Sequence, residues 1–370
     1  MVAVELATEI MKLRFEGWLE LAARWLLVGL WGLPSRSLGS LDLNRETRTI
    51  ADGGEEPLQG TEAEQRFQAG FRWNSDDDDH SYWCPQGLSS SADAAPGGRV
   101  AGQRWLVASW YHKEDEDNDR TRVSFVKMTS DGKPFRYRHV LLVEPYLDAS
   151  YRSNFRDVPN HAGGVAWLGP YLYVADTHRG MRVFDTRLIK RVSTGDADLI
   201  GRIGNEFHAH DHRYVVPQVS CYYSPTAFLF LPRWSFCGVE RTGDRSWLLT
   251  GEFKENDSGR LFWWPVGPSG LLEVNSGLWD TRASRARAPD VKRMQGALSR
   301  DNASETYISS TRGDDYLVLQ RASGNESFSW IPKPEGLTYF PEDDSIWNLN
   351  EKRGQRVVIA VSRAALSGGS

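Results

Sequence analysis

The sequence predicts an all-β fold, and two observations support that prediction. The chain of 370 residues contains 15 Trp, 13 Tyr, 15 Phe and 34 Gly, and aromatic side chains are favoured on the half-buried faces of β-sheets. After residue 66 the chain consists of short apolar runs separated by Gly, Asp or charged residues, with no long run of helical period. This alternation is typical of antiparallel strands joined by turns.

A short sequence motif, which we call the phrase, occurs five times and indicates how the strands are organised. Each copy has a Pro, Met or His corner, a polar or small residue, usually a Gly, and then an apolar run. The copies are CPQGLS at 84–89, PNHAGGVAW at 159–167, VPQVSC at 216–221, VKRMQGALS at 291–299 and KPEGLTYF at 333–340. Each is followed by enough chain for about four strands, which predicts a single β-propeller with five blades. The long first and third units leave room for a sixth blade.

The repeated phrase also predicts a site. The first strand of every blade runs along the central axis of a propeller, where Gly lets neighbouring backbones come close. The polar residue beside that Gly then points into the mouth of the axial channel. We therefore expect a ring of five side chains, namely Gln86, His161, Gln218, Gln295 and Glu335. Amides with one imidazole and one carboxylate favour recognition of a substrate over nucleophilic catalysis.

The chain divides into three parts by composition. Residues 1–40 form a signal-like or amphipathic segment, residues 41–66 a polar linker, and residues 67–366 the propeller, so that the N-terminal segment is loosely attached. The apolar run at 23–33 is too short for a stable membrane span. Basic residues before it and small residues after it are typical of a secretory signal, although the stretch before it is long and contains acids. We expect a protein of the secretory pathway or a secreted one.

Cysteines and glycosylation motifs bear on the same expectation. Asn256, Asn302 and Asn325 each begin an acceptor motif for N-glycosylation, which indicates a secreted glycoprotein. Cys221 and Cys237 stand at the two ends of an aromatic run that can double back, which predicts a disulfide between them and leaves Cys84 over. Three buried free thiols are the alternative.

Charge and motifs exclude several classes of function. The net charge of −5 argues against nucleic-acid binding, which requires a basic field. No catalytic or phosphate-binding motif such as G-x-S-x-G, H-E-x-x-H or a P-loop is present. Three clusters have ligand-like spacing, but each is better interpreted as a loop or hairpin tip: DDDD at 76–79, EDEDNDR at 114–120 and FHAHDHRY at 207–214. We therefore expect no metal and no cofactor.

Aromatic residues near the starts of the blades predict the character of the cavity. Those expected to contact a substrate are Trp83, Tyr223, Trp264 and Tyr339. Aromatic walls with a few neutral hydrogen-bonding groups suit a flat, largely apolar organic molecule.

A family resemblance gives this cavity a possible reaction. With YWCPQG at 82–87, LVASWY at 106–111, HAGGVAW at 161–167 and RVVIAV at 356–361, residues 70–362 resemble a group of secreted bacterial and fungal proteins. Within that group the chain is similar to the fungal hetero-Diels–Alderases of tropolone–sesquiterpene biosynthesis. The resemblance implies a cofactor-independent addition of a quinone methide to a terpene alkene, with small-molecule polyketide and terpene partners. It transfers no catalytic residues.

The residues themselves provide candidates for that chemistry. His161 is the expected proton shuttle, and Gln295 is an expected donor to the oxygen on which charge gathers. Arg293 either anchors a tropolone oxygen or forms a surface ion pair.

Two other functions stay open. A hydrolase or lyase acting on an extracellular glycan would use paired carboxylates near the channel, for instance Asp176 and Glu335. A non-catalytic propeller would bind a ligand or a protein at its top face. Carboxylates facing the channel would favour the hydrolase, a deep aromatic pocket the cyclase, and a flat polar face the binding protein.

Overall fold

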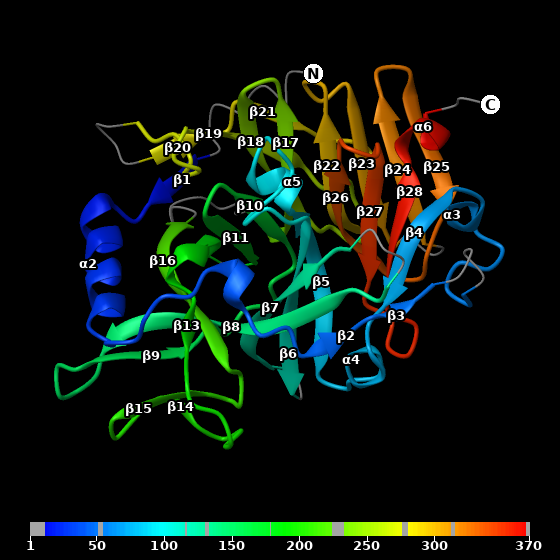
Figure 1. Cartoon of the computed structure of the whole chain (residues 1–370). Coiled ribbons are helices and arrows are strands. Elements are labelled where there is room, and N and C mark those ends of the chain that lie inside the picture. Colours follow the sequence, from blue (N-terminus) through cyan, green and yellow to red (C-terminus); the bar gives the residue numbers. More distant parts are fainter. Residues whose placement is uncertain are drawn as a thin grey trace.

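Twenty of the described strands group into five antiparallel units of four (Figure 1), of which the first two belong to one 13-stranded sheet and the last to a 5-stranded sheet. The computed structural model describes residues 12–50, 55–114, 117–129, 133–177, 179–223, 233–275, 280–311 and 315–367. The units are β5 (Trp83–Ser90), β6 (Trp105–Glu114), β7 (Asp117–Lys127) and β8 (Arg136–Leu147); β10 (Val165–Leu168), β11 (Tyr171–Asp176), β12 (Gly180–Asp185) and β16 (Tyr214–Tyr223); β17 (Trp234–Thr242), β18 (Arg245–Glu252), β19 (Leu261–Val266) and β21 (Arg285–Arg287); β22 (Met294–Arg300), β23 (Glu305–Ser310), β24 (Tyr316–Arg321) and β25 (Gly324–Ser329); and β26 (Pro334–Phe340), β27 (Ser345–Asn350), β28 (Val357–Ser362) and β4 (Phe67–Arg72).

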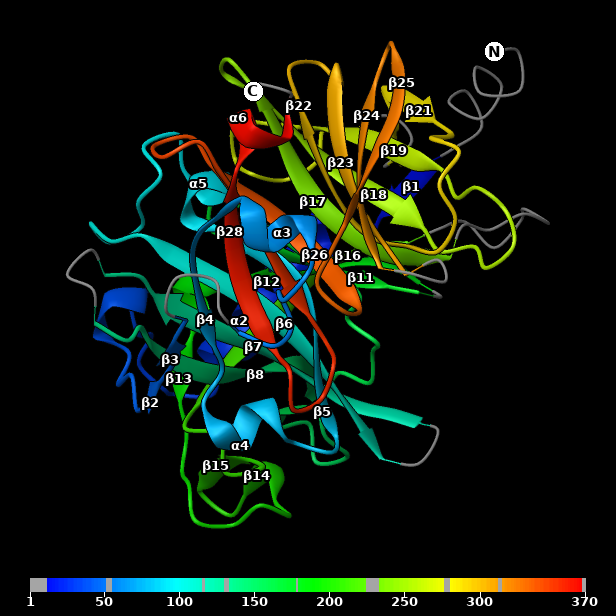
Figure 2. The same cartoon turned by 90° about the vertical axis from the view of Figure 1, so that its right-hand side faces the viewer.

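The first strands of these units form a closed ring. β5 contacts β10, β10 contacts β17, β17 contacts β22, β22 contacts β26, and β26 contacts β5 again. This arrangement is a β-propeller. The last unit joins the two ends of the propeller, because β4 from its beginning pairs with β28 from its end, with Phe71 opposite Val358. In both views the blue strand β4 lies beside the red strand β28 (Figures 1 and 2).

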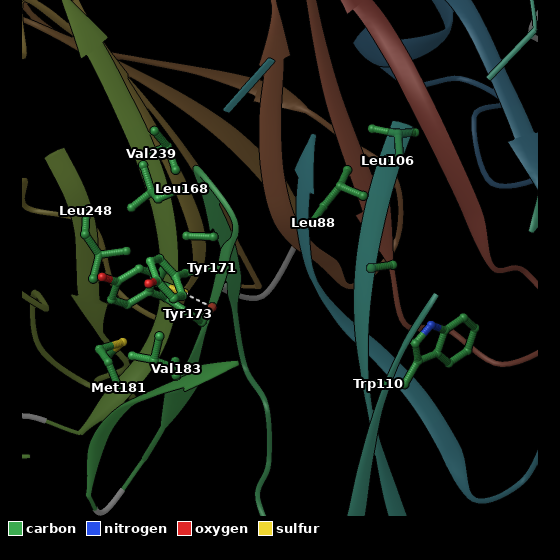
Figure 3. Packing of buried hydrophobic residues seen from close by; sticks show 14 of the residues in the cluster. Leu88, Leu106, Trp110, Leu168, Tyr171, Tyr173, Met181, Val183, Val239 and Leu248 are labelled. Carbon is green, nitrogen blue, oxygen red and sulfur yellow. Dashed lines mark hydrogen bonds between the residues drawn. The ribbon is translucent and has the colours of Figure 1, made fainter. Parts of the chain in front are cut away.

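The units pack against one another through buried apolar side chains. Figure 3 shows Leu88 and Leu106 on neighbouring strands of the first unit. It also shows Tyr173 of the second unit near Val239 and Leu248 of the third. All five side chains belong to one large buried cluster that extends across several units. The alternating strands therefore bury one face against each neighbouring blade, as the period of two predicts.

The centre of the ring has no room for side chains on its glycines. A Cβ atom on Gly87 of β5 would lie 2.2 Å from the backbone nitrogen of Val165, and one on Gly336 of β26 would lie 2.3 Å from that of Leu88. Contacts so short do not occur, so both positions require Gly. The repeated Gly of the phrase therefore lies on innermost strands, as the sequence predicts.

One copy of the phrase is not on an innermost strand. VPQVSC lies on β16, which is the outermost strand of the second unit and also pairs in parallel with β8. The innermost strand of the third unit is β17 instead, where Gly238 takes the axial position and a Cβ would lie 2.5 Å from the carbonyl oxygen of Ala297. VPQVSC has the same pattern of apolar and polar residues as the other copies but lacks their Gly. Because only an innermost strand needs that Gly, its absence agrees with an outer position.

The predicted disulfide is also wrong. Cys84, Cys221 and Cys237 are all free thiols. Cys221 lies on β16 of the second unit and Cys237 on β17 of the third, where its thiol lies 3.5 Å from the carbonyl oxygen of Tyr173. The aromatic run between them joins two different blades, so its ends do not meet as in a single hairpin. The structure matches the alternative of free thiols.

The N-terminal segment packs on the propeller, where the composition led us to expect a loosely attached one. β1 (Lys12–Phe15) pairs with β16 and with β20 (Asp280–Arg282), and α2 (Trp18–Gly29) contacts β16 and β8. The expected linker contains β2 (Arg45–Glu46), which pairs with β8, and β3 (Arg48–Thr49), which pairs with β4. Within the described part of the chain, no helix is both long enough and apolar enough to cross a membrane.

The remaining elements are short and lie between the main strands. They are η1 (Leu38–Ser40), α3 (Glu62–Gln65), α4 (Ser75–Asp78), α5 (Ser91–Ala94), β9 (Ser153–Asp157), η2 (Thr186–Leu188), β13 (Lys190–Arg191), β14 (Ile200–Ile203), β15 (Glu206–Ala209) and α6 (Arg363–Leu366). In both views α4 and the β14–β15 hairpin lie at the lower end of the molecule (Figures 1 and 2).

Candidate functional site

The candidate site lies where the innermost strands begin, beside the axial glycines. Gln86 and Glu335 each directly precede an axial Gly, and both side chains are buried. The backbone of Glu335 is fixed, because its carbonyl oxygen accepts hydrogen bonds from Ser309 Oγ at 2.7 Å and from Asn348 Nδ2 at 2.8 Å. The sequence therefore placed these two polar groups correctly at the start of an innermost strand.

Two carboxyl groups dominate this region. Glu351 accepts hydrogen bonds from Gln86 Nε2 at 2.7 Å and from Lys333 Nζ at 3.3 Å. The side chain of Glu335 is only 2% exposed, and none of the hydrogen bonds formed among the described residues ends on its carboxyl oxygens. Burial, followed by the negative charge of Glu351, raises the pKa of Glu335 well above its usual range. Glu335 therefore holds its proton to a higher pH than an ordinary glutamate, near a carboxylate that accepts two hydrogen bonds.

An imidazole and a phenol complete the group. The rings of His161 and Tyr111 pack with their centroids 4.3 Å apart. Burial lowers the pKa of His161 although the charge of Glu351 opposes this, so the imidazole is neutral. Burial, followed by the neighbouring Cys84, raises the pKa of Tyr111. We call Gln86, Tyr111, His161, Glu335 and Glu351 the mouth cluster.

Gln218 is not part of the mouth cluster, contrary to the predicted ring. Its side chain lies on the outer strand β16 and accepts a hydrogen bond from Arg182 Nη1 at 2.8 Å. The same arginine binds Asp176 at 2.8 Å. Asp176 was the expected carboxylate partner of Glu335, but the carboxylate that acts on Glu335 is Glu351.

The two remaining polar candidates lie on or next to the innermost strand of the fourth unit. Gln295 directly precedes the axial Gly296 and is partly buried. Arg293 is bound to Glu255, with Nη2 and Oε1 2.7 Å apart, and both side chains are solvent-accessible. This contact matches the alternative of a surface ion pair.

The predicted aromatic residues do not line one common chamber. Trp264 is fully buried in the third unit, where its indole donates to Thr250 Oγ1 at 2.9 Å. Tyr339 donates to Asp344 at 2.6 Å. Tyr223 ends β16, opposite Arg14 of β1, and Trp83 lies under the guanidinium of Arg122 at 4.2 Å. Strand alternation buries such residues between blades, and from sequence alone they cannot be distinguished from residues that line a cavity.

The clusters with ligand-like spacing have other partners. His208 lies near Glu206, His210 binds Asp157 at 2.9 Å, and His212 faces backbone carbonyl groups. The side chains of residues 114–119 lie outside the described part, and DDDD at 76–79 contributes α4. Throughout the described residues no group of three or more His, Cys, Asp or Glu is arranged to hold a metal ion.

Sequence reasoning missed a row of three hydrogen-bonded side chains, which are the hydroxyl of Ser124, the imidazole of His139 and the carboxylate of Asp77. Ser124 Oγ lies 2.8 Å from His139 Nδ1, and His139 Nε2 lies 3.0 Å from both oxygens of Asp77. Asp77 also accepts from Tyr137 at 2.6 Å and from Arg122 and Arg45 at 3.1 Å. These bonds hold α4 against the first unit.

This row of residues does not form a nucleophilic site. Ser124 is completely buried, so a substrate cannot reach its hydroxyl group. A serine nucleophile needs an exposed oxygen as well as a base. The row therefore has a structural role. Glu335 is nearly as buried as Ser124, so a substrate reaches it only if neighbouring side chains move, whereas Glu351 and His161 of the mouth cluster are partly exposed.

Comparisons with known proteins identify neither a family nor an activity. No family model matches the chain, and none of the curated proteins matches it. Among solved structures, similar ones include a GH43_1 enzyme from Xanthomonas citri (10% identity, 76% of this chain and 87% of that chain covered, TM-score 0.36) and the periplasmic gluconolactonase of Pseudomonas aeruginosa (10% identity, 86% and 83% covered, TM-score 0.31). A putative 6-phosphogluconolactonase from Bacteroides uniformis has 11% identity, 74% and 82% coverage and a TM-score of 0.31. Similarity this low supports no inference about activity.

Proposed function

We propose that the mouth cluster is the acid–base site of a hydrolase or lyase acting on a glycan. The observation that supports this proposal is the pair formed by Glu335 and Glu351. One carboxyl group is buried and has a raised pKa, while the other accepts hydrogen bonds from Gln86 and Lys333. Two carboxyl groups in different environments are the usual equipment for cleaving glycosidic bonds.

Each residue then has a defined role. In hydrolysis Glu335 donates its proton to the glycosidic oxygen as the bond from that oxygen to the anomeric carbon breaks, and Glu351 accepts a proton from the water whose oxygen attacks that carbon. In the lyase case Glu351 accepts the proton of a ring carbon, a carbon–carbon double bond forms, and the glycosidic oxygen leaves the adjacent ring carbon with the proton of Glu335. The amide of Gln86 keeps the Glu351 carboxylate in place, and the neutral His161 offers a hydrogen bond to a sugar hydroxyl group.

The cycloaddition of a quinone methide to a terpene has less support. That reaction needs two apolar partners held in a dry aromatic chamber. Trp264 and Tyr339, which were expected to form its walls, are engaged within the blades. A non-catalytic binding propeller would not require a proton-bearing acid beside a carboxylate.

The proposal is tested with the Glu335→Gln variant. The parent protein is incubated with a panel of extracellular polysaccharides and aryl glycosides, and new reducing ends or unsaturated products are measured. Glu335→Gln should lower the turnover number by about 10²–10⁴-fold, because the amide has no proton to donate. Glu342→Gln is the matched control, since Glu342 is exposed and paired with Arg99. Full activity of Glu335→Gln would contradict the proposal.

A further inference from the structure

A second site lies outside the mouth cluster, between the first unit, residues 44–45 and the segment 210–213 that precedes β16. A cavity of about 280 Å³ opens there. Four arginines line it, namely Arg45, Arg122, Arg138 and Arg213, together with three histidines and a single carboxylate, Asp211. Its lining is thus strongly cationic in a protein whose net charge is −5.

Three of the arginines have carboxylate partners. Arg45 and Arg122 share Asp77, at 3.1 Å each. Arg213 binds Asp42 at 2.9 Å. The positive charges of these three residues are therefore compensated at least in part within the protein.

Arg138 has no such partner. Its side chain is buried, with the residue only 8% exposed, and its guanidinium lies over the ring of Tyr214 at 5.3 Å. Among the described residues its guanidinium forms no hydrogen bond and no ion pair, and its nitrogens are not among the fully buried atoms without a partner, so they keep some accessible surface. Burial, followed by the neighbouring charge of Arg213, lowers the pKa of Arg138, and the opposing charge of Asp42 does not outweigh these two effects. A buried unpaired charge destabilises a protein unless something compensates it.

We propose that this cavity binds the phosphate or sulfate group of a small molecule. The planar guanidinium group forms two parallel hydrogen bonds to such an oxyanion, which a spherical ion such as chloride cannot accept in the same way. The cavity offers room for the oxyanion and part of the molecule that carries it. This proposal is independent of the proposed function, because none of the five residues of the mouth cluster lines this cavity.

The test is a calorimetric titration of the full chain with inorganic phosphate, with sodium sulfate, and with sodium chloride at matched ionic strength. Phosphate, sulfate or both should bind saturably with one site per chain, and chloride should not. Saturable binding of phosphate alone would identify a phosphate site, and saturable binding of sulfate alone would identify a sulfate site. Absence of saturable heat with both, or equal heat with chloride, would overturn the proposal.

The variant Arg138→Gln locates the site. It should weaken binding by about 10- to 100-fold, which is typical for the loss of a hydrogen bond to a charged group. Arg187→Gln is the matched control, since Arg187 also lies over a tyrosine, Tyr171, but has Asp185 as its partner. Unchanged affinity of Arg138→Gln would overturn the proposal.

Stability provides a readout that separates binding from folding. In anion-free buffer Arg138→Gln should melt no lower than the parent, because it removes a buried unpaired charge. Phosphate should raise the melting temperature of the parent and leave that of the variant unchanged. If Arg138→Gln fails to fold, crystals of the parent soaked in selenate decide the question: an anomalous peak beside Arg138 supports the site, and its absence there refutes it.

Discussion

At the residue level, Asp77 and His139 illustrate how burial and charge compete. Burial disfavours the charged form of Asp77, yet the interactions with His139, Arg122 and Arg45 outweigh it and hold the pKa of Asp77 well below its usual range. Burial, followed by the charge of Arg122, lowers the pKa of His139 to about 3. His139 is therefore neutral at ordinary pH, and the two arginines provide the counter-charge for Asp77.

This pair predicts sensitivity to acid. An unfolded histidine gains its proton at about pH 6.5, whereas folded His139 gains it only at about pH 3. Between these two pH values His139 is therefore protonated in the unfolded state and neutral in the folded state. The free energy of unfolding should therefore fall on acidification, by up to about 1.4 kcal/mol per pH unit from this group. In urea titrations over this range, His139→Gln should show a shallower decline.

The effect of His210 on the pH dependence of stability has the opposite sign. The pKa of His210 is raised: burial opposes the shift, but the hydrogen bond to Asp157 outweighs it. Its contribution to stability is thus present below about pH 6.5 and is lost as the pH rises through the folded pKa. His210→Gln should lose stability mainly at acid pH, and the same response in both variants would contradict this account.

The residues of the mouth cluster could be predicted only in part. Gln86, His161 and Glu335 follow from the repeated phrase, because Gln86 and Glu335 directly precede an axial Gly and His161 stands two residues before Gly163. Glu351 could not be found this way, since it is 265 residues from the Gln86 that holds it. The partners Asp77 and His139 are likewise 62 residues apart, and no sequence pattern announces their contact.

At the level of the elements, alternation and Gly placement predicted most strands. β6, β8, β10 and β26 all lie where an apolar run follows the phrase. The prediction was wrong for the third copy of the phrase, VPQVSC, because an outer strand that is buried on both faces, such as β16, has the same apolar pattern as an innermost strand. Gly is therefore the more reliable marker, because it reports the close approach of two backbones.

The axial glycines predict a large effect of a single methyl group. Gly87→Ala should destabilise the protein by about 3 kcal/mol or more, because the backbone of β10 leaves no space for a Cβ atom. Gly97→Ala is the control, since a Cβ atom at Gly97 would meet nothing within 4 Å. Urea denaturation of both variants checks this, and equal stability would contradict the packing described at the axis.

At the level of the whole molecule, hydrogen bonds between β4 and β28 close the ring, and no covalent cross-link joins the described cysteines. Cys221 and Cys237 are buried, and burial raises the pKa of the Cys221 thiol to about 12. Cys84 is more accessible.

This account predicts three titratable thiols in the unreduced protein. In the native state Cys84 should react with a thiol reagent first, while Cys221 and Cys237 should react only after unfolding. Finding a single thiol under denaturing, non-reducing conditions would contradict this prediction and would instead indicate a Cys221–Cys237 disulfide.

The central claim is that Glu335 keeps its proton at neutral pH, beside the Glu351 carboxylate. The most direct measurement is an infrared pH titration of the parent protein against Glu335→Gln, which needs no substrate. We predict that the carbonyl band of a protonated carboxyl group is present in the parent at pH 7, is missing from the variant, and persists well above the usual glutamate pKa of about 4.3. Loss of that band near the usual pKa would show that Glu335 is ionised at neutral pH and cannot act as the acid.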